Sequence, residues 1–387
     1  MGHNNVRCLY GEVVCLAPAA EEKLVSLLLS FQVLMSIERR SFLRQLAGAS
    51  LAVTSTALAA PRQLALPAES APAESAPARA AGLHQLRRGG RIAVAAPASP
   101  VSSRDLDGFL SVCRSYGLEP VLGPNINRRA GYLSAPDQDR ADEFMSFIED
   151  PSIDAIVCGR GGYGVMRILP MLDYNAIREA NKPIMGYSDI TSLLIAVHQL
   201  SGITTYHGPV ASSTFDDFTT TYVEQTLLDP GSSNQDDVLW SFTDDRVTTV
   251  QPGVGRGRIT GGNLAMVVAS LGTAYEVDTQ GAILFLEEVN EEPYRIDRML
   301  TQLWLAGKLQ SCAGIALGNF KNCEAKGRSI SGPSPSLLAV LKERTQDLGI
   351  PVVYGLPIGH VKSKLTVPLG AMAELHTTHP TLTIYRA

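Results

Sequence analysis

A serine that follows a short apolar segment is the first residue in this sequence suited to covalent chemistry. Ser188 lies in Gly186-Tyr-Ser-Asp189, between the apolar run Pro183–Met185 and a helix-like stretch from Asp189 to Leu200. This order of strand, turn and helix is typical of a nucleophile elbow, in which a serine hydroxyl projects from a sharp turn. Ser and Asp are also ordinary helix caps, and the second Gly of the usual hydrolase motif is missing. From these residues alone, a helix cap is the stronger interpretation.

A glycine-rich turn precedes this serine. The apolar run Ala155–Cys158 leads into Gly159-Arg-Gly-Gly-Tyr-Gly164, and Asp189 follows 25 residues after the last glycine. The pattern fits a dinucleotide-binding fingerprint, but that fingerprint normally opens its sheet, and Pro170 leaves room for only a short helix. Two other interpretations stay open: a tight turn that needs glycine for positive φ, or backbone N–H groups that bind an anion or an oxyanion. We expect no cofactor.

Strands and helices alternate along the chain from residue 89 onward. Short apolar runs are separated by helix-like stretches, with the runs at 91–97, 119–122, 155–158 and 183–185 and the stretches at 103–116, 137–149 and 189–200. This alternation predicts an α/β fold with a parallel, helix-covered sheet. We expect an N-terminal α/β domain with the nucleophile elbow at 89–210, a connector with one helix at 211–254, and a C-terminal mixed α/β domain at 255–387.

The segment that begins at Met35 has the features of an export signal. Arg39-Arg-Ser-Phe-Leu43 is followed by an uncharged, Ala-rich stretch from Leu46 to Ala60, and Ala57-Leu-Ala59 offers a cleavage site. We predict a twin-arginine signal peptide at 35–60, with 1–34 as an upstream extension or a long n-region. The alternative is a short buried helix that begins with two arginines. A Pro/Ala/Ser repeat predicts a disordered tether at 61–88. We therefore expect a periplasmic protein without a stable membrane anchor, or a cytoplasmic one if the signal is not used.

Charge and cysteine content exclude two classes of function. The net charge is −5 and no cluster of five or more Lys/Arg occurs, so the chain lacks the electrostatic footprint of a nucleic-acid-binding protein. The six cysteines form no CxxC pair, and none has a histidine beside it at metal-ligand spacing. We expect neither a nucleic-acid partner nor a metal site.

An ordered set of sequence blocks resembles the LD-carboxypeptidase family of serine peptidases, which also contains the microcin-immunity peptidases. The blocks are Arg91–Pro97, Gly159–Gly164, Gly186–Thr191, Tyr206–Pro209, Gly261–Leu264, Leu284–Val289 with Pro293–Leu300, and Leu356–His360. The resemblance implies an N-terminal α/β domain that carries the serine and a C-terminal domain that carries the other two members of a Ser-Glu-His triad. On this sequence it implies Ser188 as nucleophile, His360 as base and Glu287 as orienting carboxylate.

The chemistry of a serine nucleophile asks for the same residue types. A serine hydroxyl reacts slowly until an imidazole accepts its proton, and that imidazole needs a carboxylate to fix its tautomer. Glu287 also fits an exposed carboxylate at a strand end, and His360 also fits a solvated loop. The neighbouring Glu288 is the main alternative for the acid. Four other histidines are expected outside the catalytic set: His198, His207, His376 and His379.

Acyl transfer also needs an oxyanion site, and a carboxypeptidase needs a group that binds the substrate's terminal carboxylate. For the oxyanion we predict the N–H groups of Asp189 and Gly162, with Gly161 as second choice. For the carboxylate we consider Arg160 and Arg295.

The resemblance also implies a substrate class. We expect hydrolysis of the bond between the L-centre of a diamino acid and D-Ala in murein tetrapeptides. The alternatives are a microcin-immunity type peptidase that acts on peptidyl or aminoacyl nucleotides, and a catalytically silent muropeptide-binding protein. A homodimer is a further expectation from the family.

Overall fold

The computed structural model describes residues 86–228, 237–325, 328–329 and 332–386. The predicted upstream extension, the signal peptide and the tether up to residue 85 lie outside these residues. Leu86, which the sequence assigned to the tether, is buried and forms a β-bridge with Leu228. The helices of the described part include none that is long and apolar enough to cross a membrane.

The first sheet has six strands in the order β14-β5-β4-β3-β1-β2. The strands are β1 (Arg91–Ala95), β2 (Glu119–Leu122), β3 (Ala155–Cys158), β4 (Ile184–Gly186), β5 (Thr205–His207) and β14 (Val367–Leu369). β1 to β5 are parallel to their neighbours, whereas β14 is antiparallel to β5. Because β3 and β4 are adjacent and parallel, the segments after them emerge at the same edge of the sheet. These segments are the glycine-rich turn and the Ser188 turn.

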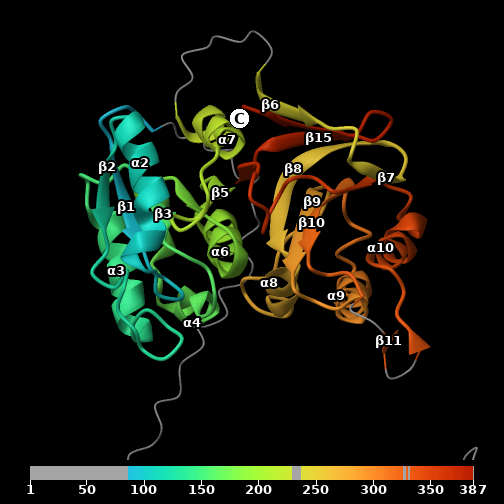
Figure 1. Cartoon of the computed structure of the whole chain (residues 1–387), viewed down its shortest axis with the longest axis horizontal. Coiled ribbons are helices and arrows are strands. Elements are labelled where there is room, and N and C mark those ends of the chain that lie inside the picture. The colour runs from blue at the N-terminus through green and yellow to red at the C-terminus, as the bar shows by residue number, and fades with distance from the viewer. Residues whose placement is uncertain (1–85, 229–236, 326–327, 330–331, 387) are drawn as a thin grey trace, which may run out of the picture. The chain divides into compact units, whose positions relative to one another are not determined.

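Helices cover both faces of this sheet (Figure 1). They are η1 (Ser103–Leu106), α2 (Asp107–Ser115), α3 (Asp137–Glu149), α4 (Val165–Ile168), η2 (Leu169–Met171), α5 (Tyr174–Ala180), η3 (Ser188–Ile190), α6 (Thr191–Ser201) and α7 (Asp217–Leu227). Val94 of β1 shares a buried cluster with Phe109 of α2, whereas its neighbour Ala93 shares another with Phe144 of α3. Successive strand residues point to opposite faces, so the two clusters lie on the two sides of the sheet. The predicted parallel, helix-covered sheet is confirmed.

The second sheet has eight strands in the order β6-β16-β15-β8-β9-β10-β13-β7. The strands are β6 (Val238–Thr243), β7 (Thr248–Gln251), β8 (Val254–Asn263), β9 (Ile283–Val289), β10 (Gly314–Lys321), β13 (Val352–Tyr354), β15 (Met372–His376) and β16 (Thr381–Tyr385). The run β8-β9-β10-β13 is parallel and the other pairs are antiparallel. The sheet therefore combines parallel and antiparallel pairs, in the half of the chain for which the sequence predicted a mixed α/β domain.

Two segments depart from the predicted domain ranges. The connector at 211–254 contains α7 and also β6, β7 and the first residue of β8, which belong to the second sheet. The alternating burial of Trp240–Thr243 is the strand signal that marks β6. In addition, β14 lies within 255–387 but pairs with β5, so the C-terminal segment completes the first sheet. The chain thus passes from the second sheet to the first at β14 and returns to the second sheet at β15.

The remaining elements of the second half are α8 (Leu264–Ala269), α9 (Pro293–Leu305), α10 (Leu337–Thr345), η4 (Gln346–Leu348), β11 (Arg328–Ser329) and β12 (Gly332–Pro333). Helix α6 contacts β4 and β5 of the first sheet as well as β8 and α8. Asn263 at the end of β8 donates its backbone N–H to Thr191 Oγ1 at the start of α6, at 3.0 Å. The helix that follows Ser188 is therefore anchored directly to the second sheet.

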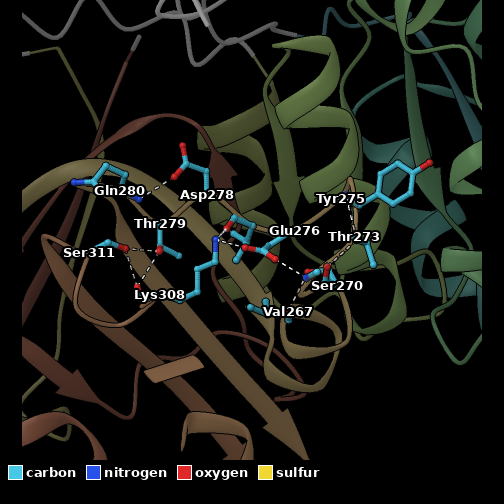
Figure 2. Close-up of polar contacts among 12 residues, drawn as sticks. Val267, Ser270, Thr273, Tyr275, Glu276, Asp278, Thr279, Gln280, Lys308 and Ser311 are labelled. Atoms are coloured by element: carbon cyan, nitrogen blue, oxygen red, sulfur yellow. Dashed lines mark hydrogen bonds and ion pairs between the residues drawn. The ribbon is translucent and has the colours of Figure 1, made fainter. Parts of the chain in front are cut away.

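Polar contacts hold the loop that leads from α8 into β9 (Figure 2). Lys308 pairs with Glu276 at 2.6 Å and also donates to the Val277 carbonyl oxygen at 2.8 Å. Thr279 Oγ1 donates to the Lys308 carbonyl oxygen and contacts Ser311 Oγ at 2.6 Å. These contacts join the segment that precedes β9, the strand that carries Glu287, to the turn that follows α9.

Candidate active site

Ser188 occupies a sharp turn between β4 and α6. Its backbone has φ of +67°, a left-handed conformation that is uncommon for a residue with a side chain and costs about 1–3 kcal/mol. A Cβ on Gly186 would lie 2.7 Å from Cγ2 of Ile190, so the tight return of the chain requires glycine there. Ser188 forms no side-chain cap on η3 or α6. The helix-cap interpretation is therefore wrong, and the turn has the geometry of a nucleophile elbow.

Asp189 links the elbow to the glycine-rich turn. Its side chain is buried and accepts a hydrogen bond from the Val165 N–H at 2.9 Å, at the start of α4. Burial raises the pKa of this carboxyl group. The Asp189 N–H lies in the first turn of η3, where helical N–H groups have no partner within the helix. Its predicted role as an oxyanion donor therefore remains compatible with its position.

Gly161 is the glycine that packs against the serine. A Cβ at this position would lie 2.8 Å from Ser188 Cβ and 3.0 Å from Ser188 Oγ. Gly162, the first choice from the sequence, has φ of +106° and faces Ser99 instead. The Gly161 carbonyl accepts a hydrogen bond from the Ser99 N–H at 3.3 Å. In a planar trans peptide the N–H points opposite to the carbonyl, so the Gly162 N–H points away from Ser99. Both glycines thus stay candidates for the oxyanion site.

The same turn argues against a dinucleotide site. Helix α4, which follows the glycines, has four residues and is closed by η2 at Pro170. The close approach that glycine permits at position 161 is used by Ser188, a residue of this chain. The described residues also contain no group of three or more His, Cys, Asp or Glu suited to hold a metal ion.

Glu287 and His360 form an acid–imidazole pair whose carboxylate is buried. His360 Nδ1 lies 2.7 Å from Glu287 Oε2, and the His360 backbone N–H donates to the same oxygen at 3.3 Å. Glu287 lies within β9 and is fully buried, so it is not an exposed strand-end residue. His360 is partly buried and is fixed by Glu287, so it is not a freely solvated loop residue. The two residues are 73 positions apart in the sequence.

Glu288, the alternative acid, has a different set of partners from Glu287. Its carboxylate accepts from the Ala265 N–H at 2.8 Å and from Asn263 Nδ2 at 3.1 Å. It therefore binds the first turn of α8, on the side of β9 opposite to Glu287. Burial raises the pKa of Glu288. Its role is structural.

Two aromatic side chains, Tyr187 and His207, pack against the acid–imidazole pair. The ring of Tyr187, the residue before Ser188, packs edge-on against His360 with ring centroids 4.9 Å apart. His207, at the end of β5, is fully buried, and its Nε2 lies 4.0 Å from Glu287 Oε1. Burial lowers the pKa of His207 to about 4, which keeps this imidazole neutral at pH 7. The sequence had assigned His207 a structural role, and the structure adds that it faces the carboxylate of Glu287.

The two arginines considered for substrate binding lie outside this cluster. Arg160 is exposed next to Gly161, within electrostatic range of Tyr187. Arg295 is exposed at the start of α9 and binds Tyr294 at 2.9 Å and Glu291 at 3.5 Å. Among the described residues, neither forms a hydrogen bond or ion pair with Ser188, Glu287 or His360. Of the other histidines, His198 binds the Ile203 carbonyl oxygen and His376 binds Glu374.

Comparison with known proteins gives matches along most of the described chain. The family model for the LD-carboxypeptidase N-terminal domain matches residues 92–208, and the one for the LD-carboxypeptidase C-terminal domain matches residues 256–375. The "Probable murein peptide carboxypeptidase" of Bacillus subtilis is 37% identical over 305 residues, which cover 77% of this chain and 92% of that protein. The "Murein tetrapeptide carboxypeptidase" of Pseudomonas aeruginosa is 30% identical over 293 residues, covering 74% and 93%.

Solved structures show the same two-domain fold. The muramoyltetrapeptide carboxypeptidase of Oxalobacter formigenes is 30% identical, with a TM-score of 0.66 over 77% of this chain and 100% of that one. The microcin C7 self-immunity protein MccF in its wild-type apo state has a TM-score of 0.71 over 79% and 98% of the two chains. Its identity is 23%, so this second likeness concerns the fold alone.

Proposed function

We propose a function from the premise that this chain belongs to the LD-carboxypeptidase family. In this proposal the protein is a serine carboxypeptidase. It hydrolyses the LD-peptide bond of murein tetrapeptides and releases terminal D-alanine. The observation that carries the proposal is the Glu287–His360 pair beside the strained turn of Ser188. The names of the relatives from Bacillus subtilis and Pseudomonas aeruginosa support the substrate class.

The reaction we infer begins with attack by Ser188 Oγ on the carbonyl carbon that precedes D-alanine. Because Glu287 binds Nδ1 of His360, Nε2 of the imidazole is the nitrogen that takes the serine proton. The Asp189 N–H and an N–H of Gly161 or Gly162 bind the oxyanion of the tetrahedral intermediate. The C–N bond then breaks as His360 gives its proton to the leaving amine. Water attacks the acyl-enzyme, passes a proton to His360, and Ser188 regains it when the product leaves.

A direct test is the release of D-alanine from a tetrapeptide muropeptide, followed by mass spectrometry with the full chain. We expect Ser188→Ala to lower the rate by about 10⁴-fold or more, because the hydroxyl is the nucleophile. Ser115→Ala, an exposed serine on α2, is the matched control and should retain the wild-type rate. Equal release by the wild type and Ser188→Ala would refute the peptidase proposal, and tight binding without any release would favour a silent muropeptide-binding protein.

The alternative substrate class, peptidyl or aminoacyl nucleotides, rests on likeness of fold. It belongs in the same assay as a second substrate. A kcat/KM for an aminoacyl sulfamoyl nucleotide above that for the tetrapeptide would replace our substrate assignment.

We also propose that the protein acts in the periplasm, after export through the twin-arginine signal at 35–60. The export signal rests on the sequence, since residues 1–85 lie outside the described part of the chain. Replacement of Arg39 and Arg40 by Lys should leave the protein in the cytoplasmic fraction. Unchanged delivery to the periplasm would exclude the twin-arginine route.

A further inference from the structure

Lys364 is a buried cation in the loop that carries His360. Its side chain is 3% exposed, and its backbone N–H donates to Thr219 Oγ1 at 3.1 Å. Its Nζ lies 5.2 Å from the centre of the Tyr187 ring. Within the described part of the chain, this ammonium group has no hydrogen-bond acceptor and takes part in no ion pair. Such a group is costly to bury, so its position calls for a partner that the protein itself does not supply.

The nearest carboxylates are already bound elsewhere. Asp216 accepts from the Thr219 N–H at the start of α7 and from the Ser363 hydroxyl. Glu287 binds His360 through Oε2. Both act on Lys364 only at longer range, and burial lowers the pKa of Lys364 to about 8. The group therefore remains mostly protonated at pH 7 and is available to an external anion.

The position of Lys364 suits the leaving side of the substrate. His360 and Lys364 both lie against the ring of Tyr187, the residue that precedes the nucleophile. In a carboxypeptidase, the amine that His360 protonates and the terminal carboxylate belong to the same residue. Their separation is two covalent bonds, so the carboxylate carbon lies about 2.5 Å from the leaving nitrogen. A cation for this carboxylate must therefore lie close to the imidazole.

We propose that Lys364 binds the terminal carboxylate of the substrate and so determines that the enzyme removes a C-terminal residue. The inference rests on the proposed function and replaces both arginines considered from the sequence. Arg160 is exposed and Arg295 already binds Glu291, whereas Lys364 is buried, unpaired and packed against the same Tyr187 ring as the imidazole. A desolvated ammonium also discriminates more strongly between a carboxylate and a neutral group than an exposed guanidinium does.

The test compares a tetrapeptide that ends in a free D-alanine carboxylate with the same peptide ending in D-alanine amide. Wild type should prefer the acid by about 10- to 150-fold in kcat/KM, the range expected for one hydrogen bond to a charged group. In Lys364→Met, hydrolysis of the acid should become slower and hydrolysis of the amide should not change. The preference for the acid should therefore disappear. Arg160→Met, Arg295→Met and the exposed-neighbour control Lys362→Met should keep it. A preserved preference in Lys364→Met would overturn the proposal.

Two further measurements separate this inference from the proposed function. Lys364→Met should unfold at the same temperature as wild type or higher, because it removes an unpaired buried charge. Binding of the acid and amide peptides to Ser188→Ala, with and without Lys364→Met, needs no catalysis. One outcome would refute the peptidase proposal and leave the carboxylate site standing. In it, wild type does not cleave the peptide, Ser188→Ala binds the acid more tightly than the amide, and Lys364→Met abolishes this difference. Equal binding of the two peptides by Ser188→Ala refutes the carboxylate site.

Discussion

Replacement of His207 by Gln should reduce the decrease in the free energy of unfolding that the protein undergoes in mild acid. The His207 imidazole is fully buried, and its pKa falls from the ordinary 6.5 to about 4 because burial disfavours the charged ring. Between these two pH values the unfolded chain binds a proton that the folded chain does not. The free energy of unfolding therefore decreases as the pH is lowered from about 6.5 to about 4, and this contribution is constant outside that window.

The size of the effect follows from the two pKa values. A tenfold change in proton affinity is worth about 1.4 kcal/mol, so the difference between 6.5 and about 4 amounts to about 3 kcal/mol from this one residue. The attraction of Glu287, 4.0 Å away, opposes the effect but does not outweigh burial. A contribution of this size is a substantial fraction of the stability of an ordinary domain.

Urea unfolding at a series of pH values from 7 to 4 measures the contribution. The free energy of unfolding of wild type should fall by about 3 kcal/mol more over this range than that of His207→Gln. His379→Gln, at an exposed site, is the matched control and should follow wild type. If the wild-type and His207→Gln curves run parallel, His207 does not titrate as its burial requires, and the account of this side chain is wrong.

Two further changes test the geometry around the nucleophile. Gly161→Ala places a methyl group 2.8 Å from Ser188 Cβ and must displace the serine, so we expect kcat/KM to fall about 10²-fold. Gly108→Ala, whose Cβ would meet no atom closer than 3.9 Å, should have wild-type kinetics, and equal kinetics of both variants would contradict the close packing. Glu287→Gln removes the charge that holds His360 Nδ1–H and should lower kcat about 10⁴-fold in the D-alanine release assay. Retention of more than a tenth of the wild-type kcat by a variant with unchanged melting temperature would exclude Glu287 as the orienting acid.

Features that depend on neighbouring residues were predicted well from the sequence. The alternation of apolar runs and helical stretches predicted the parallel, helix-covered first sheet, which the structure confirms. The strand Ile184–Gly186, the turn and the helix at Thr191–Ser201 also follow from local pattern. Whether Ser188 caps that helix or projects from an elbow did not follow, because both use the same residue types. The left-handed backbone of Ser188 is accompanied by close packing of Gly186 on Ile190 and of Gly161 on the serine, which involves residues on separate segments.

Edge strands were harder to predict than central ones. The connector at 211–254 was read as polar with one helix, yet it supplies both outer strands of the second sheet, β6 and β7. β7 is partly exposed and mostly polar, so its composition resembles that of a loop, whereas β6 has an apolar strand pattern within an otherwise polar segment. The pairing of β14 with β5 depends on a return of the chain over more than 150 residues, for which no local signal exists.

By itself, the sequence determined the fold class, the order of the two domains and, through the family resemblance, three candidate residues for a Ser-Glu-His triad. The tertiary structure decided what surrounds them. Burial and hydrogen bonding depend on segments that are distant in the sequence, and no residue type or spacing encodes them. His207 is buried against Glu287 only because β5 packs against β9. The Lys364 ammonium is left unpaired beside Tyr187 only because of how the His360 loop packs.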